Sequence, residues 1–388
     1  MTIKRNISLL FAIIFLKGFV FYGPIATLYR QSQGLNLGQI FTIESICLAI
    51  MITLEIPWGW IADRIGYKKT LIISNGLFFI SKIVFWKATG FYGFLMERII
   101  LAIAISGASG CDSAMLYKSC DSNQSDKIFS KYTMLSSFGF LLASALSTFM
   151  LKVSMETTTF FTIFPYAISF VLTLFLIDLP ISKNENNSIF NHLKTAFSNT
   201  TIIYLVLASA LMIEINQATT VFLNQDLYIK SGIPIHWFGP ILIIIQCFRM
   251  LSGKTYKLTR KFGEFKVMIF LAITTTTLCI YLSLFSYMIT SILGIIIIAT
   301  CCSIMMPIVS NIQNQNIDST NRATILSIYS MIMSLVGVPS NLIIGQFAKT
   351  SFKLGFVTCS IMGILMFICL VRFKIKLSTQ NTNLPSVK

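Results

Sequence analysis

The sequence predicts an all-α membrane protein, with twelve transmembrane helices in two pseudo-symmetric six-helix bundles. Three observations support this prediction: the composition, a series of twelve apolar runs, and a polar interruption halfway along the chain. Of the 388 residues, 55% are hydrophobic and 11% are charged, and the mean hydropathy is +0.77. Soluble domains carry roughly a quarter charged residues, so these polar side chains are too few to cover a core in water. The composition therefore excludes a water-soluble enzyme and a disordered chain.

Twelve apolar runs are long enough to cross the hydrocarbon of a bilayer, which takes about 20 residues of α-helix. They cover residues 7–29, 38–62, 70–88, 92–117, 133–153, 159–179, 200–223, 236–252, 267–287, 289–311, 322–347 and 351–372. The first run follows two basic residues, as in a signal peptide, but Lys17 interrupts it and no small-residue cleavage site follows. We therefore expect the first helix to be retained.

The longest polar interruption divides the twelve runs into two groups of six. The expected domains are an N-terminal bundle, a cytoplasmic linker, a C-terminal bundle and a cytoplasmic tail, at residues 1–180, 181–199, 200–372 and 373–388. Two six-helix halves joined by a linker are the architecture of many secondary transporters, which are built from repeats around a central site.

The formal net charge is +16, and the distribution of Lys and Arg residues among the loops predicts the orientation of the chain in the membrane. With the N-terminus inside, twenty Lys and Arg residues fall in cytoplasmic segments and six in outer segments, which is the bias of an inner-membrane protein. Both termini are then expected in the cytoplasm of a bacterial cell. Because the basic residues are spread over many loops, no nucleic-acid partner is expected.

Cysteine and histidine patterns indicate no metal or redox chemistry. The nine cysteines form no C-x-x-C pair, and the two histidines, His192 and His236, lie far apart. No cofactor is expected, so the energy source would be a gradient of protons or another ion. The expected partners are a small-molecule substrate and the lipid bilayer. The protein is expected to be a monomer.

The loop after the second predicted helix carries a compact motif at residues 59–69, GWIADRIGYKK. It resembles the G-x-x-x-D-R-x-G-R-K signature that the major facilitator superfamily of transporters carries in the same loop. Residues 55–59, EIPWG, with 106–110, SGASG, and 322–327, RATILS, resemble a bacterial twelve-helix branch with an E-I-P-x-G-x-x-A-D-R signature. Many members of that branch are described as exporters of drugs or small molecules.

The resemblance implies a conformational latch formed by Gly59, Asp63, Arg64 and Gly66. Glycines allow a close backbone approach and a turn, and an anion such as Asp63 is favoured at a helix N-terminus. In the family that helix is the eleventh, here near residues 318–322, and the contact holds the two halves together in the outward-facing state. The alternative is a solvated loop whose charges only set the topology.

Two positions depart from the family pattern. Tyr67 stands where the family has an arginine, and Lys118 stands where an acid is expected. Both ends of the family's salt bridge are thus replaced, so the latch depends on Asp63 alone or on new contacts of Tyr67 and Lys68.

Ionisable side chains inside predicted spans are candidates for a proton or substrate cavity, because burying a charge in lipid is costly. The main candidates are Lys17, Glu44, Arg98, Glu214, Gln217 and Gln225, and the secondary ones are Glu55, Glu97 and Asp112. Helical spacing places Glu44 with Glu55, and Arg98 with Asp112, on one face of their helices. Lys82 is a weaker candidate because its stem can reach the outer surface, and Arg249 is expected at a boundary.

Arg98 lies at about the position of an arginine in helix four that is linked to proton coupling in many members of the family that the chain resembles. Beside Glu97 or Glu44 it would favour the charged form of the acid and tune proton release. The alternative is a static buried ion pair, and Glu97 fits that structural role better.

Lys17 and Glu214 lie at comparable depths in symmetry-related helices one and seven. Gln217 and Gln225 follow Glu214 at helical spacing, so the three are expected on one face. We therefore expect Lys17 and Glu214 to face the cavity, pairing in one state and meeting substrate or a proton in another.

The predicted function is proton-coupled export of a small amphipathic or hydrophobic organic molecule by alternating access. Helix five, with SSFGF at residues 136–140, lacks the G-x-x-x-G-P-x-x-G-G antiporter signature. An uptake symporter for a nutrient or siderophore-like molecule is therefore the alternative, ahead of a receptor or assembly protein that transports nothing. An enzyme is not expected, since no nucleophile with a base, metal spacing or phosphate-binding loop is present.

Overall fold

The computed structural model describes residues 2–120, 125–178, 200–316 and 322–382. Every regular element in these ranges is a helix, which confirms the all-α fold class. Eleven helical segments in the described ranges are long and apolar enough to cross a membrane. They coincide with all the predicted runs except the first, which is broken.

The described chain forms two compact units. Unit 1 comprises the described residues before the linker together with Pro234–Ile243, and unit 2 comprises the described residues up to Ile233 and from Ile244 onward. The start of the eighth predicted run thus groups with unit 1. The predicted linker at 181–199 lies outside the described residues.

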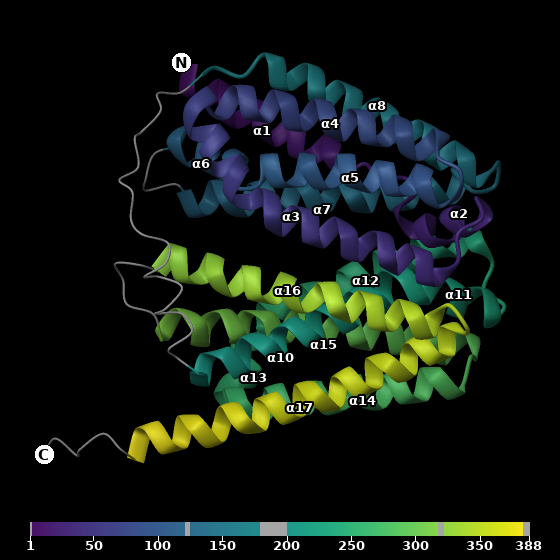
Figure 1. The fold of residues 1–388 in the computed structure, drawn as a ribbon, viewed down its shortest axis with the longest axis vertical. Coiled ribbons are helices and arrows are strands. Elements are labelled where there is room, and N and C mark those ends of the chain that lie inside the picture. The colour runs from purple at the N-terminus through teal and green to yellow at the C-terminus, as the bar shows by residue number, and fades with distance from the viewer. Residues whose placement is uncertain (1, 121–124, 179–199, 317–321, 383–388) are drawn as a thin grey trace, which may run out of the picture. The chain divides into compact units, whose positions relative to one another are not determined.

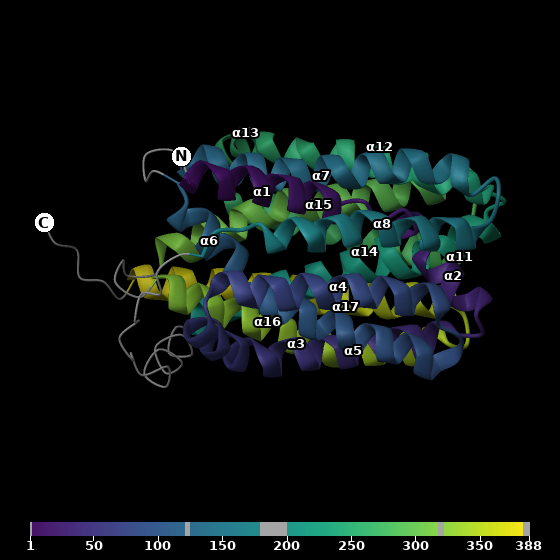
Figure 2. The ribbon, with the colours of Figure 1, turned by 90° about the horizontal axis from the view of Figure 1, so that it is seen from above.

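The long helices of unit 1 run across Figure 1, roughly alongside one another. They are α1 (Thr2–Lys17), α2 (Ala26–Ser32), α3 (Leu37–Ile65), α4 (Tyr67–Lys87), α5 (Gly90–Ala108), α6 (Cys111–Lys118), α7 (Ser125–Met150) and α8 (Met155–Leu174). Helix α5 packs against α3 and α4, helix α8 packs against α4 and α1, and helix α1 also packs against α7 (Figure 2). This arrangement brings α2, α3, α4 and α5 together around the buried charges described below.

Local sequence explains where several of these helices begin and end. Helix α3 starts with a capping box, in which Asn36 and Gln39 exchange side chain–backbone hydrogen bonds of 3.0 and 2.9 Å. Gly66, at a φ of +90°, makes the turn between α3 and α4. Gly110, at a φ of +76°, separates α5 from α6. The predicted span at 92–117 is therefore two helices, and the uninterrupted helix that the shared face of Arg98 and Asp112 requires is not present.

The first predicted span, 7–29, is interrupted near its middle. Helix α1 ends at Lys17, and a 3₁₀ turn, η1 (Gly23–Ile25), precedes α2. The intervening backbone is bound by α8, because the Tyr166 hydroxyl donates to the Lys17 carbonyl at 2.9 Å and the Phe21 N–H donates to Thr162 Oγ1 at 3.1 Å. Non-helical backbone is tolerated at membrane depth only where such partners or a cavity are present.

Close helix packing holds the start of this break in place. A Cβ at Gly18 would lie 2.6 Å from the carbonyl oxygen of Ser136, and a Cβ at Gly139 would overlap the carbonyl oxygen of Phe15. Gly18, directly after α1, and Gly139 on α7 therefore let the two segments pack backbone to backbone, as small residues do in membrane helix pairs.

The remaining helices belong to unit 2, except that α12 begins in the segment Pro234–Ile243, which groups with unit 1. They are α10 (Thr200–Gln217), α11 (Leu223–Lys230), α12 (Phe238–Arg249), α13 (Thr255–Phe262), α14 (Glu264–Leu284), α15 (Met288–Gln315), α16 (Arg322–Ala348) and α17 (Phe352–Thr382). Helix α17 packs against α14 and α10, and α10 also packs against α16 and α15. A π-helical turn, η3 (Ala218–Phe222), joins α10 to α11. Helix α17 continues ten residues past the predicted end of the last span.

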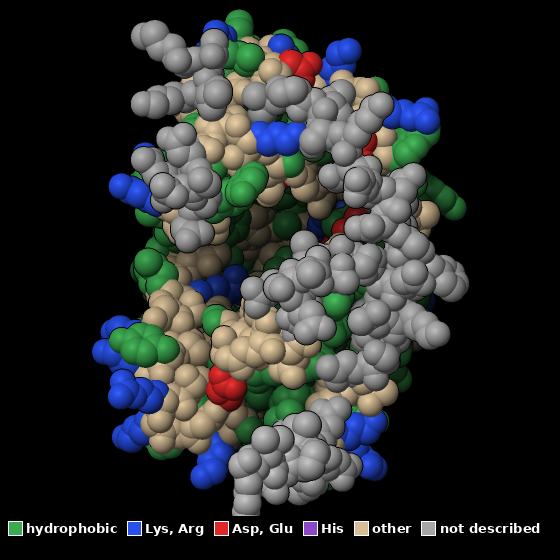
Figure 3. All heavy atoms as spheres, turned by 90° about the vertical axis from the view of Figure 1, so that its left-hand side faces the viewer, with side chains coloured by type: hydrophobic (Ala, Val, Ile, Leu, Met, Phe, Trp, Pro, Cys, Tyr) green, Lys and Arg blue, Asp and Glu red, His purple; other side chains and the backbone are tan. Residues whose placement is uncertain are grey.

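The surface of the helices is apolar and their loop ends are basic. Large apolar side chains such as Phe149, Phe270 and Ile289 are 66%, 68% and 71% exposed, as expected of side chains that face lipid. On the end of the molecule drawn in Figure 3, Lys and Arg side chains are widespread and acidic ones are few. The orientation of the chain in the membrane stays a prediction.

Candidate functional site

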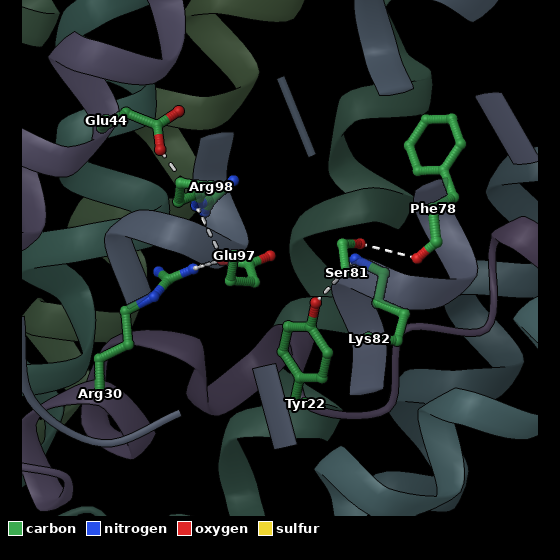
Figure 4. Close-up of polar contacts among 8 residues, drawn as sticks. All are labelled: Tyr22, Arg30, Glu44, Phe78, Ser81, Lys82, Glu97 and Arg98. Carbon is green, nitrogen blue, oxygen red and sulfur yellow. Dashed lines mark hydrogen bonds and ion pairs between the residues drawn. The ribbon is translucent and has the colours of Figure 1, made fainter. Parts of the chain in front are cut away.

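Four charged side chains form an ion-pair chain inside unit 1. Arg30 Nη2 lies 4.0 Å from Glu97 Oε2, the same oxygen lies 3.7 Å from Arg98 Nε, and Arg98 Nη2 lies 3.4 Å from Glu44 Oε2 (Figure 4). The residues come from α2, α5 and α3, so the ion-pair chain crosses three helices. Two positive and two negative charges balance formally within it.

The two acids of the ion-pair chain differ in their surroundings. The Glu97 side chain is 1% exposed and lies between the guanidinium groups of Arg30 and Arg98, whereas the Glu44 side chain is 11% exposed and lies beside Arg98. Neither carboxylate oxygen of Glu97 has a hydrogen-bond partner among the described residues. Its negative charge is therefore stabilised mainly by the two arginines.

Sequence reasoning selected Glu44, Glu97 and Arg98, and the structure brings these three together. It missed Arg30, which directly follows the predicted run at 7–29 and is one of the six basic residues counted in outer segments, but which is 3% exposed. The guanidinium carbon of Arg30 lies 5.2 Å from the ring centroid of Phe85 and 5.9 Å from that of Phe94. Glu55, predicted to share a face with Glu44, is exposed and lies outside the ion-pair chain.

Two lysines lie among aromatic side chains in the same unit. The Lys82 ammonium donates to the Tyr22 hydroxyl at 3.0 Å (Figure 4) and lies 4.9 Å from the ring centroid of Tyr166. The Lys17 ammonium lies 3.9 Å from the ring centroid of Phe78. Lys82 is 4% exposed, so the expectation that it reaches the outer surface is wrong.

Glu214 is the buried acid of unit 2. Its Oε2 accepts a 2.7 Å hydrogen bond from Asn341 Nδ2, and the same amide group donates to the Gly337 carbonyl at 2.9 Å. Asn341 thereby ties α16 to α10. Sequence reasoning missed this asparagine, although a polar residue inside the apolar run at 322–347 was the available signal.

The π-turn changes the expected alignment of Gln217 and Gln225. Glu214 and Gln217 lie in the same helix, α10, so their helical spacing is kept. The π-turn η3 separates Gln225 from both, so the α-helical spacing that placed Gln225 on their face does not apply. Gln217 is half-buried at the end of α10, and Gln225 is buried and donates to the Val221 carbonyl at 3.1 Å.

Arg249 contacts the same irregular segment. Its Nη2 donates to Asn216 Oδ1 at 3.3 Å and to Thr220 Oγ1 at 3.4 Å. Thr220 lies in the π-turn and donates to the Asn216 carbonyl at 2.7 Å. Arg249 therefore points at the end of α10, whereas the sequence predicted only a boundary residue. π-Turns are frequent at functional sites.

Asp112 makes a structural contact near the end of unit 1. Its Oδ2 accepts from the Tyr132 hydroxyl at 2.9 Å, and its Oδ1 accepts from the Ser113 N–H at 2.7 Å. These bonds link α6 to α7 and occupy both carboxylate oxygens.

The latch loop lies at the junction of α3 and α4. Asp63 and Arg64 are exposed, and the Arg64 guanidinium lies 3.7 Å from the ring centroid of Trp60. Gly66 makes the turn as predicted, but within unit 1 nothing described lies within 4 Å of a Cβ at Gly59, so a close approach is not seen there. The expected partner at 318–321 lies outside the described residues, and the latch stays a prediction.

The two positions that depart from the family pattern contact each other. The Lys118 ammonium lies 5.0 Å from the ring centroid of Tyr67, within the range of a cation–π interaction. An attraction between α4 and α6 thus remains where the family has a salt bridge. The EIPWG and SGASG motifs also meet, because Trp58 packs against Gly107 at 3.0 Å from its Cβ position.

No group of three or more His, Cys, Asp or Glu side chains in the described ranges is arranged to hold a metal ion.

One family model matches most of the chain. The family model described as Major Facilitator Superfamily matches residues 7–341. An "Uncharacterized transporter" of Buchnera aphidicola subsp. Schizaphis graminum is 27% identical over 192 residues, which is 47% of each chain. The chain thus matches about half the length of that curated relative.

Solved structures of transporters share the fold. The nucleoside transporter NupG has a TM-score of 0.79 at 15% identity, covering 96% of this chain and 100% of its own. A D-xylose-proton symporter has a TM-score of 0.73 at 16% identity, covering 96% and 97%. A POT family transporter in complex with a thioalcohol-conjugated peptide has a TM-score of 0.74 at 13% identity, covering 98% and 99%.

Proposed function

Because this chain belongs to the Major Facilitator Superfamily and is a multi-pass membrane transporter rather than an enzyme, we propose that it is a proton-coupled secondary transporter of a small organic molecule. The two units supply alternating access, as in other transporters built from repeats. A monomer in the bacterial inner membrane with both termini in the cytoplasm performs the cycle, driven by the proton gradient without a bound cofactor.

The ion-pair chain in unit 1 is the observation that carries this proposal. Four charges buried in a membrane bundle are costly, and a purely structural link between helices is achieved more cheaply by apolar packing. Buried acids paired with arginines inside membrane segments instead mark proton or ion pathways.

Glu44 is the proton-exchanging group, and Glu97 positions Arg98. The Glu44 carboxylate lies 3.4 Å from the Arg98 guanidinium and keeps some access, while the less exposed Glu97 carboxylate lies between Arg30 and Arg98. Protonation of Glu44 removes its attraction to Arg98, which loosens the link between α3 and α5 and frees the Arg98 guanidinium.

The remaining predicted site residues belong to the same proposal. Asp63 latches the units in the outward-facing state, and the Asp63→Asn variant should therefore lose transport at normal expression. Lys17 and Glu214 pair in one state, so that Lys17→Glu with Glu214→Lys should restore part of the transport that each single variant loses. No rescue in the double variant would argue against the pairing.

Export is the first candidate direction, supported by the resemblance of the EIPWG and SGASG motifs to a branch with many exporters. Uptake by symport is the second candidate, supported by the fold similarity to a solved structure described as a D-xylose-proton symporter and by the missing antiporter signature. In vesicles of known orientation, the sign of substrate movement under an imposed pH gradient separates the two.

The experiment begins with a ligand-stabilisation screen of the purified protein at two pH values, since a ligand that binds the native state raises its stability. The best ligand is then used in proteoliposomes for gradient-driven accumulation and for exchange without a gradient. Glu44→Gln should retain exchange and lose accumulation, because substrate still binds but no proton is carried.

The matched control is Glu156→Gln, which removes an exposed acid at the start of α8 and should change neither readout. Full accumulation by Glu44→Gln would contradict the proposed coupling site. Loss of both readouts in a folded variant would place Glu44 in substrate binding instead.

A further inference from the structure

We propose that Lys17 and Lys82, together with the Tyr22 hydroxyl, form a binding site for the anionic group of a small organic substrate, a carboxylate or a phosphate. We call these three residues the lysine site. This inference rests on the proposed transport function and adds the chemical class of the substrate to it.

The first argument is the charge balance of the lysine site. Neither ammonium has a carboxylate within 4.0 Å in the described part of the chain, whereas both arginines of the ion-pair chain do. Asp112, at the start of α6, attracts Lys17 through its charge, but it lies beyond 4.0 Å from the ammonium and accepts a hydrogen bond from Tyr132. Two cations inside a membrane bundle thus lack an ion-pair partner, and a bound anion would supply one.

The aromatic contacts of the two lysines do not replace an anion. Cation–π interactions contribute about 0.5–2 kcal/mol each, which is less than the several kcal/mol needed to move a charge out of water. The Lys82 ammonium has three N–H donors, and the hydrogen bond to Tyr22 uses one of them. Donors therefore remain for a ligand.

The second argument is that the two ammonium groups converge on one aromatic pair. The rings of Phe78 and Tyr166 lie 6.3 Å apart between centroids. Lys17 lies over Phe78, and Lys82 lies over Tyr166. Two cations from α1 and α4 therefore flank neighbouring rings, which is a suitable arrangement for an anion on an apolar organic body.

The third argument is the interruption of the first span, which is independent of charge. Helix α1 stops at Lys17, and Tyr22 lies just before η1, so both residues bound the non-helical backbone. In membrane transporters, broken helices at mid-membrane depth line ligand sites. The break places one lysine and the hydroxyl that binds the other on the same short segment.

Contacts connect the lysine site to the ion-pair chain. The Tyr22 ring stacks on the Phe85 ring with centroids 4.1 Å apart. The guanidinium carbon of Arg30, a member of the ion-pair chain, lies 5.2 Å from the centroid of the same Phe85 ring. Substrate binding at Lys82 and proton exchange at Glu44 would thus act on one packed group of side chains.

The test uses matched pairs of small probes that differ in charge: benzoate with benzamide, nicotinate with nicotinamide, and acetate with acetamide, each at millimolar concentration. The readout is the unfolding temperature of the purified full-length protein in phospholipid-free detergent, which excludes lipid headgroups as the source of the anion. Inorganic phosphate is tested separately against chloride at equal ionic strength. Acids or phosphate should stabilise the wild type more than their matched partners do.

The variants are Lys17→Met, Lys82→Met and the double variant, with Lys87→Met as the control. Lys87 is an exposed lysine on the same helix as Lys82, stacked on Trp86 at 3.7 Å. In the double variant the affinity for the charged probes should fall at least tenfold, and the charge-dependent stabilisation should fall with it. The stabilisation should persist in Lys87→Met. Tyr22→Phe, which keeps the ring, should weaken it less.

The inference is overturned if the acids and phosphate stabilise the protein no more than their matched partners do. It is also overturned if the charge-dependent stabilisation survives in the double variant. Because the readout is binding, it is independent of proton coupling. A charge-selective site in a protein whose Glu44→Gln variant still accumulates substrate would retain this inference while rejecting the proposed coupling site.

Discussion

Replacing Glu97 with glutamine should destabilise the protein more than the same replacement at Glu44. Glu97 participates in two ion pairs, at 3.7 and 4.0 Å, and Glu44 in one, at 3.4 Å. With an effective dielectric constant of about 20, each pair corresponds to roughly 4–5 kcal/mol of gross attraction. Glu97→Gln therefore removes about twice the attraction that Glu44→Gln removes, and it leaves two guanidinium groups without the carboxylate between them.

The net effect is smaller than the gross attraction because desolvation offsets it. Breaking a buried pair by removing one partner typically costs about 3–5 kcal/mol, and we expect Glu97→Gln at the upper end of this range and Glu44→Gln at or below the lower end. Removing the stranded cation as well, in Arg30→Met with Glu97→Gln, should recover part of the loss. The Arg98–Glu44 pair then remains as a balanced unit.

Equilibrium unfolding in mixed micelles, supported by unfolding temperatures, measures these differences, with Glu156→Gln as a control that should change stability by about 1 kcal/mol or less. A Glu44→Gln variant as unstable as Glu97→Gln would refute the reasoning. So would a double variant no more stable than the Glu97→Gln single variant.

Three further predictions concern the packing and the polar links. Gly139→Val should lower the unfolding free energy by about 3 kcal/mol or more, because its side chain would overlap the α1 backbone; unchanged thermal unfolding would contradict the crossing. Asn341→Leu should lower the unfolding free energy by about 1–3 kcal/mol, because it removes a hydrogen-bond donor to the buried Glu214 carboxylate. Asn341→Asp should be more destabilising still, and the order of the unfolding temperatures checks this. Tyr67→Leu should weaken the α4–α6 contact by about 0.5–1 kcal/mol while Tyr67→Trp preserves it, and equal stability of the two variants would exclude a cation–π contribution.

The regular part of the fold was accessible from the sequence because lipid imposes a simple pattern. Apolar runs of about 20 residues identify the helices in both units, and glycine identifies the turn at Gly66. These features depend only on local composition and backbone freedom.

The irregular part of the fold depends on tertiary partners and was not accessible. The break after Lys17 is stable because Tyr166 and Thr162, which are 149 and 141 residues away from their partners, bind its backbone. An apolar run gives no sign of such partners. The break also shortens the first helix, which explains why Arg30 was assigned to a loop although it is buried.

The candidate site was partly predictable for the same reason. Charges inside apolar runs are visible in a sequence, so Glu44, Glu97 and Arg98 could be selected by type and position. Whether two such residues share a helix face depends on an uninterrupted helix, and the turns at Gly110 and η3 break that condition.

The π-turn of unit 2 changes the pattern of accessibility that single-residue labelling should give along this membrane-spanning segment. A π-turn contains one residue more than an α-turn, so the positions after Phe222 are rotated by about 100° relative to a continuous α-helix. Single-cysteine labelling along Thr200–Lys230 should therefore show two periodic patterns with a phase jump between them. Deleting one residue from Ala218–Phe222 should merge the two patterns into one.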